Sequence, residues 1–146
     1  RIPIFGEIVI RGLNGFAWPA TFMASKKKGQ MTEAIKKGYL APYHNWASRI
    51  ATHRFVKDIP MKSSHPSWQT MVAIEKGLPI FKDTPMHLFW GRLDFCFNDK
   101  FLAKWKLLFP KAEIKEYLDA GHYVLEDAKP EILEDISKWA KENAVK

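Results

Sequence analysis

The chain has 146 residues, a length typical of one domain with a substantial core, and its 47% apolar and 27% charged residues are typical of a globular protein. No apolar run approaches the roughly 20 residues that a membrane-spanning helix needs, and no secretory signal is visible. The single cysteine, Cys96, excludes an internal disulfide and fits a reducing compartment, so we expect a cytoplasmic protein without a membrane span.

The net charge of +7 lies entirely in the first part of the chain. Residues 1–60 carry ten Lys and Arg against three Asp and Glu, whereas residues 61–146 carry thirteen of each kind. A basic segment can bind nucleic acid, but this one has no zinc-ligand spacing and no RNA-binding signature. We favour a solvated, basic helical surface and expect no nucleic-acid partner.

The part before Pro85 has a helical pattern that is interrupted by proline and glycine, and residues 13–80 show no strand-like alternation. Helices are expected at residues 17–25, 31–40, 44–55 and 65–78. In the third of these, apolar residues repeat at helical spacing on one face. In the fourth, Ser67 is expected to cap the helix and Gly77 to end it.

After Pro85 the pattern changes to alternating strands and helices. Residues 86–90 are short and apolar, as in a buried strand, and residues 112–118 are expected to form a second strand. Amphipathic helices are expected at residues 98–109, capped by Asn98, and at residues 129–144. This order of strand, helix, strand and helix is a βαβ unit followed by one more helix.

Asp94 and His122 follow the two expected strands at equivalent positions. The strands of a βαβ unit are parallel and usually neighbours, so their carboxyl ends lie at one edge of the sheet, where functional groups collect. Each residue comes four positions after the last residue of its strand, 90 to 94 and 118 to 122. We expect the two side chains to meet, so that the carboxylate fixes the tautomer of the imidazole and stabilises it when it accepts a proton.

Simpler interpretations exist for both residues. Asp94 could cap a turn, since Asp is common in loops, and His122 could be an ordinary loop histidine. Asp119, Glu126 and Asp127 are nearby alternatives to Asp94, but the first is expected in a turn and the other two are expected to lead into the last helix. The matching positions in one βαβ unit favour Asp94 and His122 as an acid–base pair.

The stretch LFWGRLDFCFNDKFLAKWKLLFPKAEIKEYLDAGHYVLEDAKPEILEDISKW closely resembles the end of α/β-hydrolases of the haloalkane dehalogenase group. The likeness is strongest to the branch near the olefin-biosynthesis β-lactone decarboxylases. In that family W-G-x-x-D ends with the triad acid and D-A-G-H-Y contains the triad histidine, which implies Asp94 as acid and His122 as base. The upstream segments RGLNGFAWPATFMA, LAPYHNWASRIATHRFVKDIP and HPSW resemble the helical cap of the same family.

The fold class that the resemblance implies is α/β, as the C-terminal portion of an α/β-hydrolase. Residues 1–84 correspond to the helical cap, and residues 85–146 to the strand-helix-strand-helix end of the core. A triad also needs a nucleophile on an elbow flanked by glycines, and no Ser or Asp of this chain lies in such a setting. In the family this elbow lies upstream of the cap, so the resemblance implies that the nucleophile is not in this chain.

Two parallel strands make an incomplete sheet, with unpaired backbone groups along its edge. We therefore expect the sheet to be completed by another chain or by an N-terminal half, and this chain alone to be inactive as a hydrolase. A non-catalytic subunit or remnant is the competing interpretation.

The resemblance also implies a mechanism in the intact enzyme. An upstream carboxylate would attack an electrophilic carbon to form an ester, and His122, oriented by Asp94, would activate water to hydrolyse that ester if the substrate is a haloalkane. In the decarboxylase branch the carboxylate would open a β-lactone, which loses CO2 to give an alkene. An ordinary ester or an epoxide is a further alternative for the substrate.

A small apolar substrate is implied, bound by aromatic residues beside the two loops, Phe95 and Tyr123, and in the cap, Phe16 and Trp18. Core packing is the alternative for each of them. Phe97, which also follows Asp94 closely, suits the same apolar pocket. The other histidines show no metal-ligand spacing, so we expect neither a metal nor a cofactor.

Overall fold

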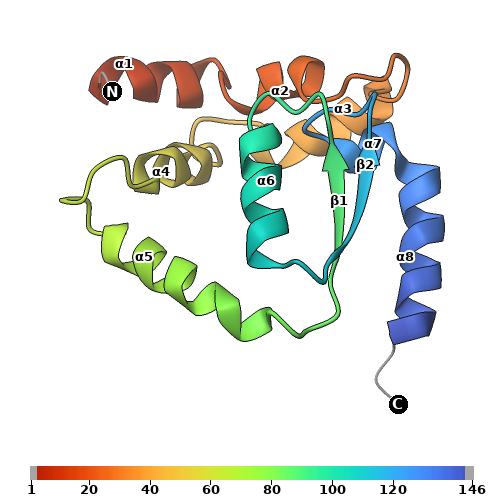
Figure 1. Ribbon diagram of the computed structural model, residues 1–146. Helices are drawn as coiled ribbons and strands as arrows, with labels where there is room; N and C mark the ends of the chain where they lie inside the picture. Colours follow the sequence, from red (N-terminus) through yellow and green to blue (C-terminus); the bar gives the residue numbers. More distant parts are fainter. Residues whose placement is uncertain (1–2, 144–146) are drawn as a thin grey trace. The chain divides into compact units, whose positions relative to one another are not determined.

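A computed structural model describes residues 3–143 of the chain (Figure 1). The chain forms two compact units. The helical unit comprises Arg1–Met23 and Met31–Gly77, and the strand-containing unit comprises Ala24–Gln30 and Leu78–Lys146. No helix of the described residues is long and apolar enough to cross a bilayer.

The helical unit contains five α-helices in its described part. They are α1 (Pro3–Glu7), α2 (Ala17–Met23), α3 (Glu33–Leu40), α4 (Ile50–Asp58) and α5 (Trp68–Gly77), with a π-helical turn η1 (Ile8–Gly12) and a 3₁₀ turn η2 (Ala41–Tyr43). Helices α2, α3 and α5 confirm the expected helices, and Gly77 ends α5 as predicted. The segment of α1 and η1 was not predicted as helical.

Local hydrogen bonds of side chains explain where two helices of this unit begin. Helix α3 begins after Thr32, whose hydroxyl oxygen accepts a hydrogen bond from the backbone N–H of Ile35 at 3.3 Å. Helix α4 begins six residues later than the predicted residue 44, because Asn45 and Ser48 exchange hydrogen bonds that compete with helix. The hydroxyl of Ser67 donates to Asp58.

The strand-containing unit holds the predicted βαβ order. Strand β1 (His87–Gly91) leads through α6 (Asp99–Leu108) to strand β2 (Glu113–Tyr117), which is followed by α7 (Val124–Asp127) and α8 (Lys129–Asn143); a 3₁₀ turn, η3 (Leu78–Phe81), precedes β1. The strands are parallel, with His87 opposite Glu113 and Gly91 opposite Tyr117. Asn98 caps α6 as predicted, since its side-chain oxygen accepts from the N–H of Lys100 at 3.1 Å.

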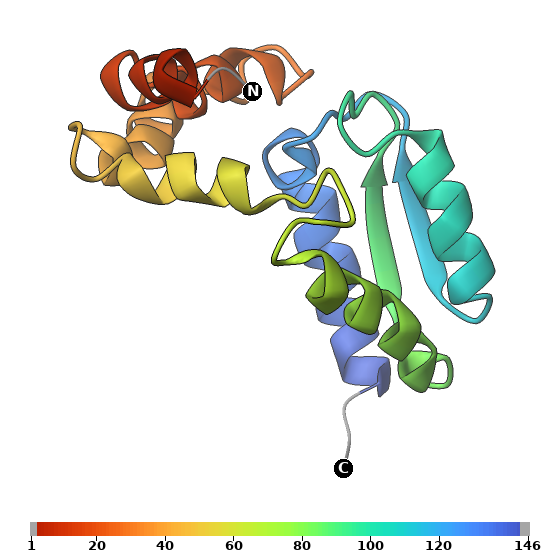
Figure 2. The ribbon, with the colours of Figure 1, turned by 90° about the vertical axis from the view of Figure 1, so that its left-hand side faces the viewer.

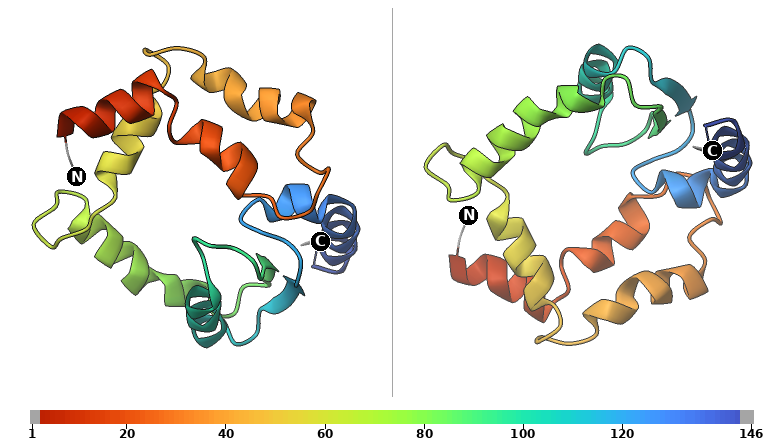
Figure 3. Two further views of the ribbon diagram at one scale, coloured as in Figure 1. Left: turned by 90° about the horizontal axis from the view of Figure 1, so that it is seen from above. Right: turned by 90° about the horizontal axis from the view of Figure 1, so that it is seen from below.

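Helices α6 and α8 cover opposite faces of the two-stranded sheet, and α8 lies on the far side of the strands from α6 in both Figure 1 and Figure 2. Figure 3 shows both helices nearly end-on, so their axes run along the strands. Parallel sheets usually have both faces covered by helices, and this sheet has one helix on each face.

The core of this unit lies where β2, α7 and α8 meet. Tyr117, Ala120, Ala128 and Ile132 form one buried cluster, against which Phe89 and Val124 pack. The apolar faces of the helices are covered only in part. On α6, Leu102 is 3% exposed but Phe101 is 44% exposed, and on α8, Ile132 is 1% exposed but Leu133 is 55% exposed. A sheet of two strands is too narrow to cover a whole helical face.

The sheet is incomplete in the described residues, as predicted. Each strand is paired along one edge only, in the order β1-β2.

Candidate functional site

The loops that follow β1 and β2 are joined by backbone contacts at the carboxyl edge of the sheet. Backbone N–H groups of Arg92 and Leu93 donate to the carbonyl oxygens of Tyr117 and Ala120 at 3.0 and 2.9 Å. Gly91 lies so close to the second loop that a Cβ there would overlap the carbonyl oxygen of Gly121 and lie 2.8 Å from that of Ala120. A glycine at position 91 is what lets the two loops approach each other.

Asp94 and His122 meet across these loops. Nδ1 of His122 lies 2.9 Å from Oδ2 of Asp94, in a hydrogen bond that confirms the predicted juxtaposition of the two side chains. The other carboxylate oxygen of Asp94 accepts from the N–H groups of Cys96 and Phe97 at 2.7 and 2.9 Å. The Asp94 side chain is 10% exposed and that of His122 is 30% exposed. The carboxylate is therefore fixed from both sides, and the imidazole keeps an accessible face.

This geometry sets the tautomer of His122. A carboxylate accepts hydrogen bonds, so Nδ1 carries the proton that faces Asp94 and Nε2 carries the lone pair. An imidazole in this state can take a proton at Nε2, and the carboxylate then stabilises the positive charge.

Aromatic rings surround the imidazole of His122. The ring centroids of Phe95, Phe97 and Tyr123 lie 5.9, 5.4 and 6.0 Å from that of His122. A cavity of about 220 Å³ opens beside the pair and is lined by Phe89, Trp90, Gly91, Asp94, Phe97, Gly121, His122 and Val124. Phe95, Phe97 and Tyr123 thus all lie against His122, and the ring of Phe97 also makes a T-shaped contact with that of Phe101.

Phe16 and Trp18 belong to the helical unit. Their side chains are 50% and 54% exposed, and the ring of Trp18 contacts that of Phe22 edge-on at 4.9 Å. Their assignment to substrate binding, like the catalytic roles of Asp94 and His122, stays a prediction.

Asp127 has a role in the structure that the sequence pattern did not indicate. Its carboxylate is 1% exposed and accepts hydrogen bonds from Gly121 and from the segment that contains Ser25 and Lys26. Asp119, by contrast, is an exposed turn residue, as expected, and pairs with Lys27 at 3.2 Å.

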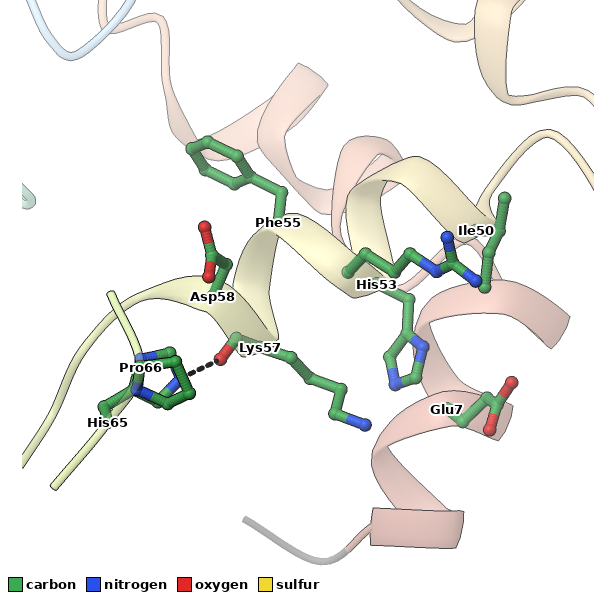
Figure 4. A pocket seen from close by; sticks show the side chains of 9 residues that line it. Glu7, Ile50, His53, Phe55, Lys57, Asp58, His65 and Pro66 are labelled. Carbon is green, nitrogen blue, oxygen red and sulfur yellow. Dashed lines mark hydrogen bonds between the residues drawn. The ribbon is translucent and has the colours of Figure 1, made fainter. Parts of the chain in front are cut away.

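A larger hollow of about 680 Å³ lies in the helical unit (Figure 4). Figure 4 shows His53, Lys57 and Glu7 gathered on one side of it and His65 on the other. His65 is bound at both ring nitrogens: Nε2 donates to the carbonyl of Lys57 at 3.1 Å, and Nδ1 accepts from Ser67 N–H at 3.2 Å. His65 therefore joins α4 to the start of α5.

The carboxylate of Glu7 at this hollow accepts a hydrogen bond from the guanidinium of Arg11, which lowers the pKa of Glu7. In the described residues, no three His, Cys, Asp or Glu side chains are grouped so that they could hold a metal ion.

Two curated proteins are similar to this chain over most of its length. A cis-3-alkyl-4-alkyloxetan-2-one decarboxylase of Shewanella oneidensis is 38% identical over 142 residues, which are 97% of this chain and 44% of that protein. The protein of the same name from Xanthomonas campestris pv. campestris is 40% identical over 128 residues, 88% of this chain and 42% of that protein. The chain thus spans less than half the length of these relatives. No family model matches.

Solved structures of haloalkane dehalogenases have the same fold. The ancestral haloalkane dehalogenase AncHLD2 superposes with a TM-score of 0.81 at 22% identity, over 97% of this chain and 49% of that one. The dehalogenase DatA from Agrobacterium tumefaciens C58 superposes with a TM-score of 0.75 at 21% identity, over 95% and 47%. The chain has the fold of the C-terminal part of an α/β-hydrolase, and Asp94 and His122 face each other at the carboxyl edge of its strands.

Proposed function

We propose that this chain supplies the acid and the histidine of a nucleophile–acid–histidine triad, with Asp94 as acid and His122 as base. The hydrogen bond of 2.9 Å between Nδ1 of His122 and Oδ2 of Asp94 carries this proposal. It joins two loops at the carboxyl edge of neighbouring parallel strands, where active sites of open α/β sheets lie. The aromatic rings of Phe95 and Tyr123 around His122 suit a small apolar substrate.

The nucleophile would come from sequence that corresponds to the rest of the relatives' length, since no glycine-flanked Ser or Asp occurs in these 146 residues. We assign residues 1–84 to a cap over the substrate, with Phe16 and Trp18 among its apolar contacts. The unpaired edge of β1 would then pair with a strand from that same sequence or from another chain.

Two reactions fit such a triad, and the sequence likeness favours decarboxylation of a cis-3-alkyl-4-alkyloxetan-2-one. The curated relatives with that activity in their name are 38% and 40% identical to this chain, whereas the dehalogenase structures are 21% and 22% identical. Hydrolysis of a haloalkane is the second candidate, favoured by the common fold.

The two reactions require different roles of His122, as a proton acceptor in one and as a hydrogen-bond donor in the other. A haloalkane reacts in two steps: a carboxylate displaces halide to form an ester, and Nε2 of His122 takes a proton from the water that hydrolyses the ester. With an oxetanone, the upstream carboxylate would attack C4 and break the C4–O bond, which opens the ring and frees the carboxylate of the lactone. The bond from C3 to that carboxyl carbon then breaks, so that CO2 leaves, a C3=C4 bond forms and the enzyme's carboxylate is expelled, with no water consumed. Protonated His122, stabilised by Asp94, would there donate a hydrogen bond to the carboxylate that develops as the C–O bond breaks.

Product analysis tests the proposal on the complete gene product. With a cis-3-alkyl-4-alkyloxetan-2-one we expect an alkene and CO2, detected by gas chromatography and mass spectrometry, and with a 1-haloalkane no stoichiometric halide. Halide and alcohol without any alkene would instead establish the second candidate. The variant His122→Ala should lose alkene formation, while His44→Ala, a change at an exposed histidine, should retain it.

A further inference from the structure

Asp127 is a buried carboxylate that the proposed triad does not use. Its side chain is 1% exposed and lies at the end of α7 beside the buried Ala128. Burying an ionised carboxylate is costly unless hydrogen bonds replace its water. The donors of these hydrogen bonds therefore show which segments of the chain the carboxylate connects.

Asp127 receives hydrogen bonds from two segments that are far apart in sequence. Oδ2 accepts from the backbone N–H of Gly121 at 2.7 Å and from that of Lys26 at 2.9 Å. Oδ1 accepts from the hydroxyl of Ser25, 102 positions earlier in the chain, and from the N–H of Lys27 at 3.2 Å. Burial raises the pKa of Asp127, but the hydrogen bonds from Gly121, Ser25, Lys26 and Lys27 outweigh it and hold the pKa below its ordinary value.

The backbone on both sides of His122 is anchored to this same assembly. Gly121, just before His122, donates to Asp127, and Tyr123, just after it, donates to the carbonyl oxygen of Ala24 at 2.9 Å. Gly121 packs closely against the segment, since a Cβ at this position would lie 2.6 Å from the carbonyl oxygen of Ala24. The peptide that carries the imidazole is thus held on one side by Asp127, through Gly121, and on the other side by Ala24, through Tyr123. Asp127 in turn accepts hydrogen bonds from residues 25–27, which follow Ala24.

We propose that Asp127 is a positioning residue for His122: its carboxylate ties Gly121 to residues 25–27 and so fixes the imidazole against Asp94. The proposal rests on the proposed catalytic role of His122, but its geometry can be measured without turnover. A displacement of a catalytic group by about 1 Å can lower a rate on the order of 100-fold. The segment around Lys26 and Lys27, which the sequence marks only as basic, then acts through its backbone N–H groups.

The experiment compares Asp127→Asn with Asp119→Asn in the complete gene product. Both changes neutralise one carboxylate of the segment that contains His122, but the Asp119 side chain is 67% exposed and pairs with the side chain of Lys27 instead of its backbone. The first readout is the NMR signal of the His122 Nδ1 proton, which a hydrogen bond to a carboxylate shifts downfield; it is assigned by its loss in His122→Ala. The second readout is kcat against KM for alkene formation.

We expect Asp127→Asn to shift or broaden the Nδ1 proton signal and to lower kcat on the order of 10- to 100-fold with little change in KM. Asp119→Asn should change neither. An unchanged His122 signal in a folded Asp127→Asn variant would overturn the proposal even if His122→Ala abolishes turnover. A shifted signal with unchanged turnover would instead support the positioning role and contradict the catalytic role of His122.

Ser25→Ala keeps the proposal testable if Asp127→Asn does not fold. This change removes one donor to Oδ1 and leaves the carboxylate and its backbone donors in place. We expect a smaller shift of the same Nδ1 signal in a variant that still folds, because only one of the donors to Asp127 is lost. An unaltered signal in Ser25→Ala, alongside an unfolded Asp127→Asn, would mean that Asp127 serves folding alone and would overturn the positioning role.

Discussion

Gly91 at the end of β1 lies directly against the carbonyl oxygen of Gly121, so the loop of Asp94 and the loop of His122 touch through a residue that has no side chain. The contact brings the ends of the two strands close enough for the hydrogen bond between the side chains of Asp94 and His122. The distance between acid and histidine therefore depends on a glycine three positions before Asp94.

Gly91→Ala should separate the two loops, because its Cβ would overlap backbone atoms that cannot move independently. Overpacking of this kind destabilises a protein by about 1–3 kcal/mol, and the Nδ1 proton signal of His122 should weaken. Urea unfolding and NMR measure the two effects. Gly38→Ala in α3 is the matched control, since a Cβ there meets no atom within 4 Å and alanine in a helix is more stable than glycine by roughly 0.5–1 kcal/mol. Equal stability of Gly91→Ala and the unmodified protein would contradict the account.

Asn98→Ala should weaken the start of α6, the helix between the two strands. The Asn98 side chain accepts from the N–H of Lys100 at 3.1 Å, in the extended backbone conformation of a cap. Loss of such a cap lowers the free energy of unfolding by about 1 kcal/mol, which urea unfolding can measure. Asn98→Asp should retain most of this stabilisation, because Asp is also a good cap. If the alanine and aspartate variants unfold at the same urea concentration, the cap contributes nothing to the stability of the protein.

Asp127 should make the stability of the protein depend on pH in the acid range. Its pKa is depressed in the folded state: burial raises it, and the hydrogen bonds from Gly121, Ser25, Lys26 and Lys27 lower it further than burial raises it. The contribution of this carboxylate is therefore fully present above the unfolded pKa of about 3.9 and is lost as the pH falls through the folded value.

Asp127→Asn tests this dependence by comparison with the unmodified protein. The difference in free energy of unfolding between the two should be largest near neutral pH and should shrink below about pH 4. Urea unfolding at a series of pH values measures it. A difference that stays constant from neutral to acid pH would show that the charge of Asp127 does not stabilise the fold.

Much of the strand-containing unit could be predicted from the sequence because its signals are local. Pro85 and Gly91 bound the first strand, Asn98 marks the start of α6, and periodic apolar residues define α6 and α8. The meeting of Asp94 and His122 then follows from the parallel topology alone, since both loops leave the same edge of the sheet.

What could not be predicted depends on contacts between distant residues or on competing local hydrogen bonds. The start of α4 is shifted because Asn45 and Ser48 bond to each other's backbone. The burial of Asp127 depends on N–H groups from Lys26 and Lys27, about a hundred positions away. No spacing pattern around Asp127 indicates such donors, so the sequence predicted only that Asp127 leads into the last helix.

The most direct test of the account is a double-mutant cycle on Asp94 and His122, with alkene formation by the complete gene product as the measured activity. If the two side chains act as one unit, Asp94→Asn and His122→Ala should each lower kcat on the order of 10³- to 10⁴-fold. The double variant should then be no slower than His122→Ala. A His122→Ala variant that keeps its rate, or losses that multiply in the double variant, would contradict the assignment of these two residues as a catalytic pair.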